Sequence, residues 1–255
     1  MNRAAILLLV IATTAMAEVG EIQTRFTEAC RAYEKGEYPL AASEFQALIE
    51  MGSATAAVHY NLANTHFKQD KMGWAVRHYR KAIELNPGDR DARANLEYVR
   101  SVIQQGTPRR PPLLSQWSAA FSLDVWTMSA AAAATLWLLL TLGCQIYTGW
   151  KESLSAIRPI LGFLAILLSV ATVGVHHQQS SDTSAVITAK SVEARFGPIE
   201  ESAAAFTLRD GTEIEVLGMF NGWCLVRESG QREGWMPADA LQSIGRQARL
   251  LTASE

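Results

Sequence analysis

The chain has 255 residues, a formal net charge of −2 and a charged fraction of 19%, which is enough length for two small domains and a membrane segment. The near-neutral balance, without a cluster of basic residues, excludes an electrostatic nucleic-acid binder. Cys30, Cys144 and Cys224 are far apart and form no paired metal-binding or disulfide pattern. We expect all three to be small buried apolar side chains.

Residues 1–17 have the pattern of a secretory signal peptide. Arg3 precedes a short apolar core over Ala4–Ala12, and Ala15-Met16-Ala17 is a small-residue cleavage site. The pattern predicts cleavage after Ala17, with an uncleaved anchor as the alternative. In either case the segment that follows is exported.

Residues 18–105 match themselves when the sequence is shifted by 34 positions. The shift pairs aromatic and small residues: Phe26 with Tyr60, Ala29 with Ala63, Tyr33 with Phe67, and Phe45 with Tyr79. This period resembles the tetratricopeptide repeat, a pair of antiparallel helices. Ala56–Asp89 is the better copy and Ile22–Thr55 the weaker one. A helix over Ala92–Gln105 is expected to cap the last apolar face.

The resemblance implies a concave peptide-binding groove lined by the first helix of each repeat. The predicted groove residues are Phe26, Cys30, Tyr33, Tyr60, Asn61, Asn64, Phe67, Lys68, Asn95 and Tyr98. Asn61 and Asn95 are expected to bond a peptide backbone, so replacing Tyr60, Asn61 and Asn64 by alanine should remove binding at little cost in stability. The alternative is that these residues only pack or face solvent.

Two further patterns in the repeats bear on the kind of site. A clamp for a C-terminal carboxylate needs Lys and Asn where this chain has Phe26 and Cys30, so we do not expect one. His59, His66 and His78 have no carboxylate or cysteine cluster beside them and are interpreted as packing residues rather than metal ligands.

Residues 106–124 connect the repeats to an apolar region. Gly106–Pro112 is rich in proline and predicts a stiff, extended linker. Trp117 and Phe121 are four positions apart and share a helical face, which favours an interfacial helix on the bilayer over Leu113–Trp126.

Two apolar runs, residues 125–147 and 159–178, are predicted to be transmembrane helices, since a helix needs about 20 apolar residues to cross a bilayer. The first run contains no Asp, Glu, Lys or Arg. Lys151 and Arg158 lie in the loop 148–158, which is therefore expected to be cytoplasmic. Two crossings return the chain to the same side. The alternative is a buried hairpin of a soluble helical domain.

Residues 179–245 read as a small β module, followed by a tail over 246–255. Its motifs resemble a bacterial SH3 domain: Arg195-Phe196-Gly197-Pro198, then Asn221-Gly222-Trp223, then Gly234-Trp235-Met236. The resemblance implies a small closed barrel whose ligand face, for peptides or cell-wall fragments, holds Arg195, Trp223 and Trp235. The alternative is that both tryptophans belong to the barrel core.

The expected fold class is a multidomain membrane protein with an all-α tetratricopeptide-repeat solenoid, a two-helix transmembrane hairpin and an all-β SH3-like barrel. This order resembles the BatE-like proteins of the Bat (Bacteroides aerotolerance) operon. The resemblance implies a scaffold in the bacterial inner membrane with both soluble domains periplasmic. It also implies von Willebrand-type Bat proteins and a MoxR-type ATPase system as partners, and a role in envelope and oxidative stress tolerance.

No enzyme signature is present: the sequence has no Gly-rich phosphate loop, no Gly-x-Ser-x-Gly, no HExxH and no CxxC. We therefore expect a non-enzymatic protein without cofactor or metal. The alternative function is a cell-wall (peptidoglycan) binding or sensing protein that acts through the SH3-like domain.

Overall fold

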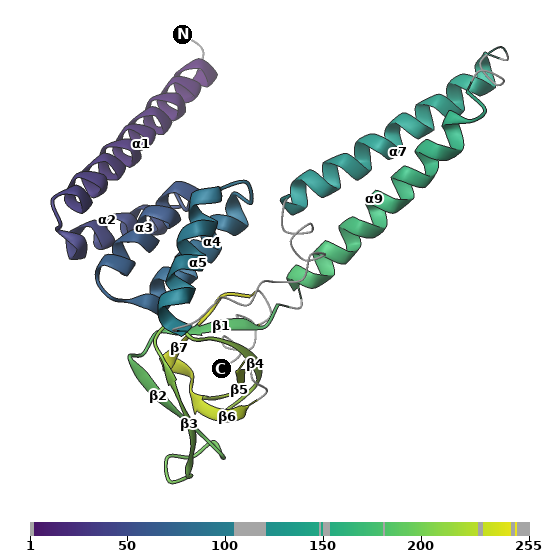
Figure 1. Cartoon of the computed structure of the whole chain (residues 1–255). Coiled ribbons are helices and arrows are strands. Elements are labelled where there is room, and N and C mark those ends of the chain that lie inside the picture. Colours follow the sequence, from purple (N-terminus) through teal and green to yellow (C-terminus); the bar gives the residue numbers. More distant parts are fainter. Residues whose placement is uncertain are drawn as a thin grey trace.

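The repeats begin the chain as a stack of five helices. The computed structural model describes residues 3–104, 121–147, 149, 154–180, 182–228, 232–245 and 248. The stacked helices, each packed on the next, are α1 (Arg3–Glu34), α2 (Tyr38–Glu50), α3 (Ala56–Lys68), α4 (Met72–Leu85) and α5 (Arg90–Gln104). Figure 1 shows α1 projecting beyond the stack toward the N-terminus. Its backbone continues through Ala17, so the predicted cleavage site lies inside a helix.

Small and aromatic residues let these helices approach closely. Ala29, Ala41 and Leu62 are fully buried around the Phe45 ring in the first half of the stack. Sharp turns separate the helices at Gly36 and Gly52, which have positive φ angles of 80° and 85° that glycine adopts without strain. The 34-residue period of the sequence therefore corresponds to the successive helix pairs of the stack.

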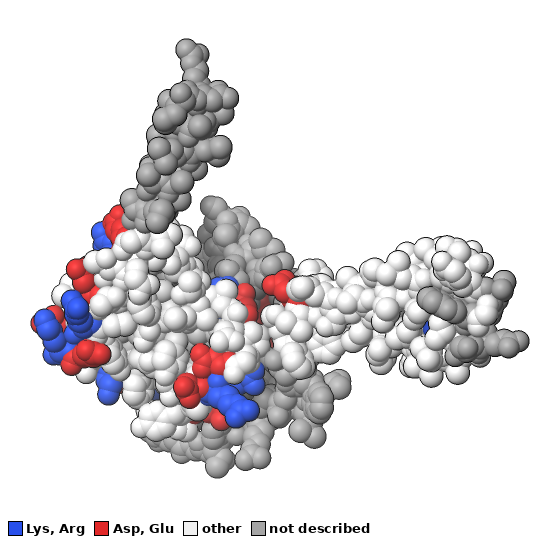
Figure 2. Space-filling view, turned by 90° about the horizontal axis from the view of Figure 1, so that it is seen from above, with Lys and Arg blue, Asp and Glu red and all other residues white. Residues whose placement is uncertain are grey.

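Two long apolar helices follow, α7 (Leu123–Ile146) and α9 (Ile157–Ser180), packed along each other as a hairpin. A Cβ at Gly162 would lie 2.8 Å from the Trp137 indole nitrogen, so this glycine is required for the close approach. Their most apolar windows are only 0% and 11% buried inside the protein, unlike the core helix of a soluble domain. Figure 2 shows the hairpin surface to be almost free of charge.

The predicted linker and interfacial helix lie mostly outside the described residues. The description resumes at Phe121, whose ring meets Trp126 edge-on at 6.2 Å. The predicted interfacial helix therefore stays a prediction.

The C-terminal module is an antiparallel seven-stranded sheet in the order β3-β2-β6-β5-β4-β1-β7. The strands are β1 (Ser184–Ile187), β2 (Ser191–Arg195), β3 (Ala204–Arg209), β4 (Glu213–Phe220), β5 (Trp223–Glu228), β6 (Glu233–Pro237) and β7 (Leu241–Ser243), with a 3₁₀ turn, η1 (Ala238–Ala240), before β7. Ala185, Leu208, Val216 and Met236 are among the residues that fill the core inside the curved sheet.

The expectation of a closed barrel is wrong. In the described part of this module no ladder joins β3 to β7, the two ends of the sheet. Among the described residues, the ladder between β2 and β6 consists of the Arg195–Trp235 pair. In the neighbouring ladder between β2 and β3, the register shifts between Ala194 and Arg195. This irregularity turns the β2–β3 hairpin away from the rest of the sheet, as Figure 1 shows.

The sheet packs directly against the repeats, which the sequence did not predict. Along β1, Ala185 and Ile187 face the sheet core, whereas Val186 faces the opposite way and is fully buried among Leu96, Val99 and other residues of α4 and α5. Successive side chains of a strand point to opposite faces, so β1 is buried on both. The sheet, through Val186, covers the apolar face of the last described repeat helix, α5.

Polar contacts close the same junction. The Asp210 carboxylate accepts hydrogen bonds from the backbone N–H groups of Met72 (2.8 Å) and Gly73 (2.9 Å). These are the first residues of α4, whose N-cap residue Lys71 supplies no side-chain bond. A residue of the sheet module therefore caps a helix of the repeats and meets the positive end of its dipole.

Candidate functional site: the repeat groove and the sheet face

A hollow of about 190 Å³ opens on the repeats, and it is lined by Tyr33, Asn64, Phe67, Lys68, Tyr79, Asn95, Tyr98 and Val99. Helices α1, α3 and α5 each contribute to it, because the first helices of successive repeats lie side by side. The structure thus brings together the predicted groove residues Tyr33, Asn64, Phe67, Lys68, Asn95 and Tyr98.

The floor of the hollow is a hydrogen-bonded network. The Asn64 side-chain oxygen accepts from the Tyr79 hydroxyl at 2.5 Å and from the Asn95 amide nitrogen at 3.2 Å. The same Asn95 nitrogen donates to the Tyr60 hydroxyl at 3.2 Å. Burial raises the pKa of Tyr79, so its hydroxyl stays a neutral donor. The network fixes the orientation of the Asn64 and Asn95 side-chain amides. It uses the Asn64 oxygen and the Asn95 nitrogen, and not the Asn64 nitrogen or the Asn95 oxygen.

Aromatic rings form the wall of the hollow. Phe67 and Tyr98 meet edge-on with their centroids 5.8 Å apart, and Tyr98 is 60% exposed. Lys68 is the charged residue of the lining. A surface that combines exposed rings, fixed amides and one cation suits a peptide segment with apolar side chains.

Two of the remaining predicted groove residues, Phe26 and Tyr60, pack against buried rings of the repeats. Phe26 packs edge-on against Phe45 at 5.9 Å, and Tyr60 against Tyr79 at 6.1 Å. The Asn61 amide nitrogen donates to the Ala57 carbonyl of its own helix at 3.0 Å. Because Tyr60 and Asn64 hold buried contacts, the expectation that alanine at positions 60, 61 and 64 costs little stability is not supported by this geometry.

Tyr79 and Val99 line the hollow but were not predicted to do so. Tyr79 lies on the second helix of its repeat, at a position that the repeat pattern assigns to packing. Its hydroxyl donates to Asn64 of the groove, and no local sequence signal indicates that contact. Cys30, also predicted, is half-buried, and burial raises its pKa.

The three histidines pack together inside the repeats. His78 stacks on His59 and on His66, with centroids 5.3 and 5.4 Å apart, and on Trp74 at 6.2 Å. Burial lowers the pKa of His59 and of His66 to about 4, and that of His78 well below its usual range. These rings pack on one another, and their lowered pKa values correspond to neutral imidazoles. Among the described residues, no group of three or more His, Cys, Asp or Glu is placed to hold a metal ion.

The second candidate surface is the outer face of the sheet. Along β5 and β6, Cys224, Val226, Gly234 and Met236 are buried and alternate with half-exposed residues. Both predicted tryptophans, Trp223 and Trp235, are among the half-exposed ones. They therefore lie on the outer face rather than in the core.

Arg195, the third predicted ligand residue, is engaged within its own loop. One guanidinium nitrogen donates to the carbonyls of Glu200 and Ser202, both at 2.7 Å, and the other to the Glu193 carboxylate at 3.2 Å. It holds the β2–β3 connection, which exposes Phe196 (74%). Phe220 at the end of β4 is also exposed, at 55%.

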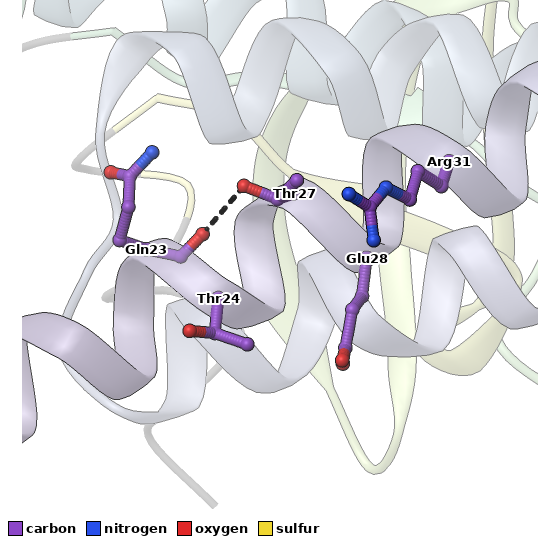
Figure 3. Close-up of a pocket in the computed structure, with 5 residues that line it drawn as sticks. All are labelled: Gln23, Thr24, Thr27, Glu28 and Arg31. Carbon is purple, nitrogen blue, oxygen red and sulfur yellow. Dashed lines mark hydrogen bonds between the residues drawn. The ribbon is translucent and has the colours of Figure 1, made fainter.

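A larger hollow of about 270 Å³ lies along α1 and is lined by Gln23, Thr24, Thr27, Glu28 and Arg31. Figure 3 shows that all five side chains project from this one helix. The Thr27 hydroxyl donates to the Gln23 carbonyl at 2.9 Å. Because a single helix supplies the whole lining, this surface cannot enclose a ligand and is not the candidate site.

Comparison with protein families identifies both soluble modules. Residues 56–89 match the tetratricopeptide repeat, and residues 190–242 match the bacterial SH3 domain. The two matched segments lie on either side of the apolar hairpin, as the sequence motifs predicted. The likeness to BatE-like proteins rests on the order of these parts alone.

Comparison with individual proteins adds little. No curated protein matches the chain. Among solved structures, the crystal structure of MamA is similar over 66% of this chain and 85% of that chain, with 15% sequence identity and a TM-score of 0.32.

Proposed function

We propose that this protein is a membrane-anchored scaffold that holds a protein partner in the groove of its repeats. The observation that carries the proposal is the hollow on α1, α3 and α5, with Tyr33, Phe67 and Tyr98 around a fixed pair of asparagines. Tetratricopeptide repeats bind protein segments, and exposed aromatic rings are the side chains that contribute most to such binding.

Anchoring is supported by the two helices and by the junction. Both helices have the length and composition that a membrane crossing needs, and their apolar windows are almost wholly exposed on the surface of the protein. The repeats and the sheet module contact each other through Val186 and Asp210, so they must share one compartment. A hairpin that crosses twice satisfies this condition. With an exported N-terminus, both modules are periplasmic on the bacterial inner membrane.

The proposed role is non-enzymatic. The groove offers neutral phenols and amides with a single lysine, and such a set lacks a paired nucleophile and base. The order of the parts resembles BatE-like proteins, so the partners we propose are von Willebrand-type Bat proteins and a MoxR-type ATPase system in envelope and oxidative stress tolerance.

The test compares two exposed rings on different surfaces. Tyr98 in the groove is 60% exposed and Phe220 on the sheet is 55% exposed, so either can be replaced by alanine at similar structural cost. Affinity purification of the full chain from native membranes should recover a partner with the wild type and the F220A variant, and lose it with Y98A. Equal recovery with Y98A would show that the groove is not the binding surface.

A second function, cell-wall binding or sensing, is favoured by the outward placement of Trp223 and Trp235 and by the exposure of Phe196 in the same module. Stacking of sugars or peptides on these rings would support it. The full chain in detergent should then sediment with purified peptidoglycan, and W223A should abolish sedimentation while Y98A does not. Failure of the wild type to sediment would remove this alternative.

A further inference from the structure

Helix α5 separates the groove from the junction with the sheet. Asn95 and Tyr98 line the hollow. Two residues further on, the Arg100 guanidinium donates from Nε and Nη2 to the two carboxylate oxygens of Glu213, at 2.6 and 2.9 Å. Between these polar contacts, Leu96 and Val99 are buried against Val186 of β1. One helix thus carries the groove side chains and is held by the sheet module.

Helix α4 repeats this arrangement. Tyr79 donates into the groove network through Asn64, whereas its neighbour Arg80 bonds Glu213 and Asp182, each at 3.2 Å. Asp182 directly follows α9 in the described chain, so the same arginine also ties the end of the hairpin to the repeats.

The charge of the partly buried Glu213 is paired at the junction with Arg100 and Arg80. Burial by itself would raise the pKa of Glu213, but the hydrogen bonds and charges of Arg100 and Arg80 outweigh burial and lower that pKa. A buried carboxylate whose arginines were removed would be strongly unfavourable. The two arginines of the repeats therefore stabilise the docked position of Glu213.

We propose that the docked sheet module positions α5 and thereby sets the shape of the repeat groove. The proposal rests on the groove function proposed above, and it makes Arg100, Glu213, Val186 and Gly73 positioning residues. A terminal helix of a repeat stack needs a cover for its outer apolar face, and here that cover is a different domain. Separation of the domains leaves Leu96 and Val99 without their partner and frees α5 to move relative to α1 and α3.

Gly73 offers a way to separate the domains by adding a single methyl group. A Cβ at this position would lie 2.0 Å from the Ile187 backbone oxygen, which cannot move aside like a flexible side chain. The same Cβ would lie 2.7 Å from a carboxylate oxygen of Asp210, so G73A pushes β1 away and also displaces the carboxylate that caps α4. The matched control is G20A in α1, where a Cβ meets nothing within 4 Å.

Two spin labels report the width of the groove in the full-length protein in detergent. Glu97 on α5 and Glu28 on α1 are both exposed and can be replaced by labelled cysteines in a background that carries Cys30→Ala. We expect a single narrow distance distribution in the wild type and in G20A, and a broadened or shifted one in G73A. Hydrogen exchange of residues 184–187, measured in parallel, should accelerate about tenfold in G73A because the junction opens.

Arg100 supplies an independent variant. R100A should broaden the distance distribution, and R100K, which keeps the charge but not the two-point geometry, should restore it in part. An unchanged distribution in G73A would overturn the proposal, whether β1 loses its protection or keeps it. The distance between the two labels can be measured without a bound partner. If the wild type captures no protein, the scaffold function is refuted, but the label distances still test whether the sheet module positions α5.

Discussion

Arg100 and Glu213 form a two-point ion pair that joins the last repeat helix to the fourth strand of the sheet, with contacts of 2.6 and 2.9 Å. Their side chains are 32% and 25% exposed, so the pair is partly withdrawn from water. Arg100 lies on the same helix, α5, as the groove residues Asn95 and Tyr98. The apolar hairpin of α7 and α9 separates the two modules in sequence, but the two modules are in contact in space.

Replacing Arg100 by alanine should lower the free energy of unfolding of the protein by about 2 kcal/mol, because a partly buried carboxylate loses two charged hydrogen bonds. Urea unfolding followed by tryptophan fluorescence measures this change. The control is K81A, which breaks an exposed pair with Glu84 at 2.8 Å and should cost no more than about 0.5 kcal/mol. Equal changes in the free energy of unfolding for the two variants would mean that the Arg100–Glu213 pair stabilises the protein no more than an exposed ion pair does.

The histidine stack predicts instability in acid. A histidine in an unfolded chain has a pKa of about 6.5, whereas burial, with nearby cations, lowers the pKa of His59 and His66 to about 4 in the folded protein. Between these values the unfolded chain binds protons that the folded chain does not. The stability contributed by the neutral rings is therefore complete above pH 6.5 and is lost progressively as the pH falls toward 4.

The melting temperature of the full chain should therefore fall by about 5 °C or more between pH 7 and pH 5. The H66F variant retains an aromatic ring against Trp74 and His78 and should show a weaker dependence. A melting temperature that stays constant over this range in the wild type would contradict the assignment of neutral, buried imidazoles.

The groove network predicts a specific non-additivity. Asn64→Ala leaves the buried Tyr79 hydroxyl without its acceptor and should cost about 2 kcal/mol. In a Tyr79→Phe background the same replacement should cost clearly less, because no donor is left unpaired. Urea unfolding of the four proteins of this double-mutant cycle measures the coupling. Strict additivity would show that the hydroxyl and the amide do not depend on each other.

Features set by local pattern could be predicted from the sequence. The period of small and aromatic residues indicated the helical pairs, the uncharged runs indicated α7 and α9, and the Gly-Trp motifs indicated the bacterial SH3 domain. Six of the predicted groove side chains line one hollow, because the repeat period sets which face of each first helix lies beside the next; that this hollow binds a peptide stays a prediction.

Features set by long-range contact could not be predicted. Gly73 and Asp210 are 137 positions apart, and a glycine in a helix with an aspartate before a turn gives no sign that the two meet. The closed barrel was wrongly expected because the shift at Arg195 depends on how β2 meets β6, which no motif encodes. The interior roles of Tyr60 and Asn64 likewise arise from Tyr79, on the next helix.

The most direct test of the scaffold account is the compartment of the two modules. Single cysteines at Glu97 and Glu233, which are exposed on the repeats and the sheet, can be probed in intact spheroplasts with a thiol reagent that does not cross membranes. Cys30, Cys144 and Cys224 are each replaced by alanine in every variant, and a cysteine at position 151, between the two apolar helices, serves as the internal marker. The account predicts that both modules are labelled in intact spheroplasts and that position 151 is labelled only after lysis. Labelling of one module without the other would contradict it.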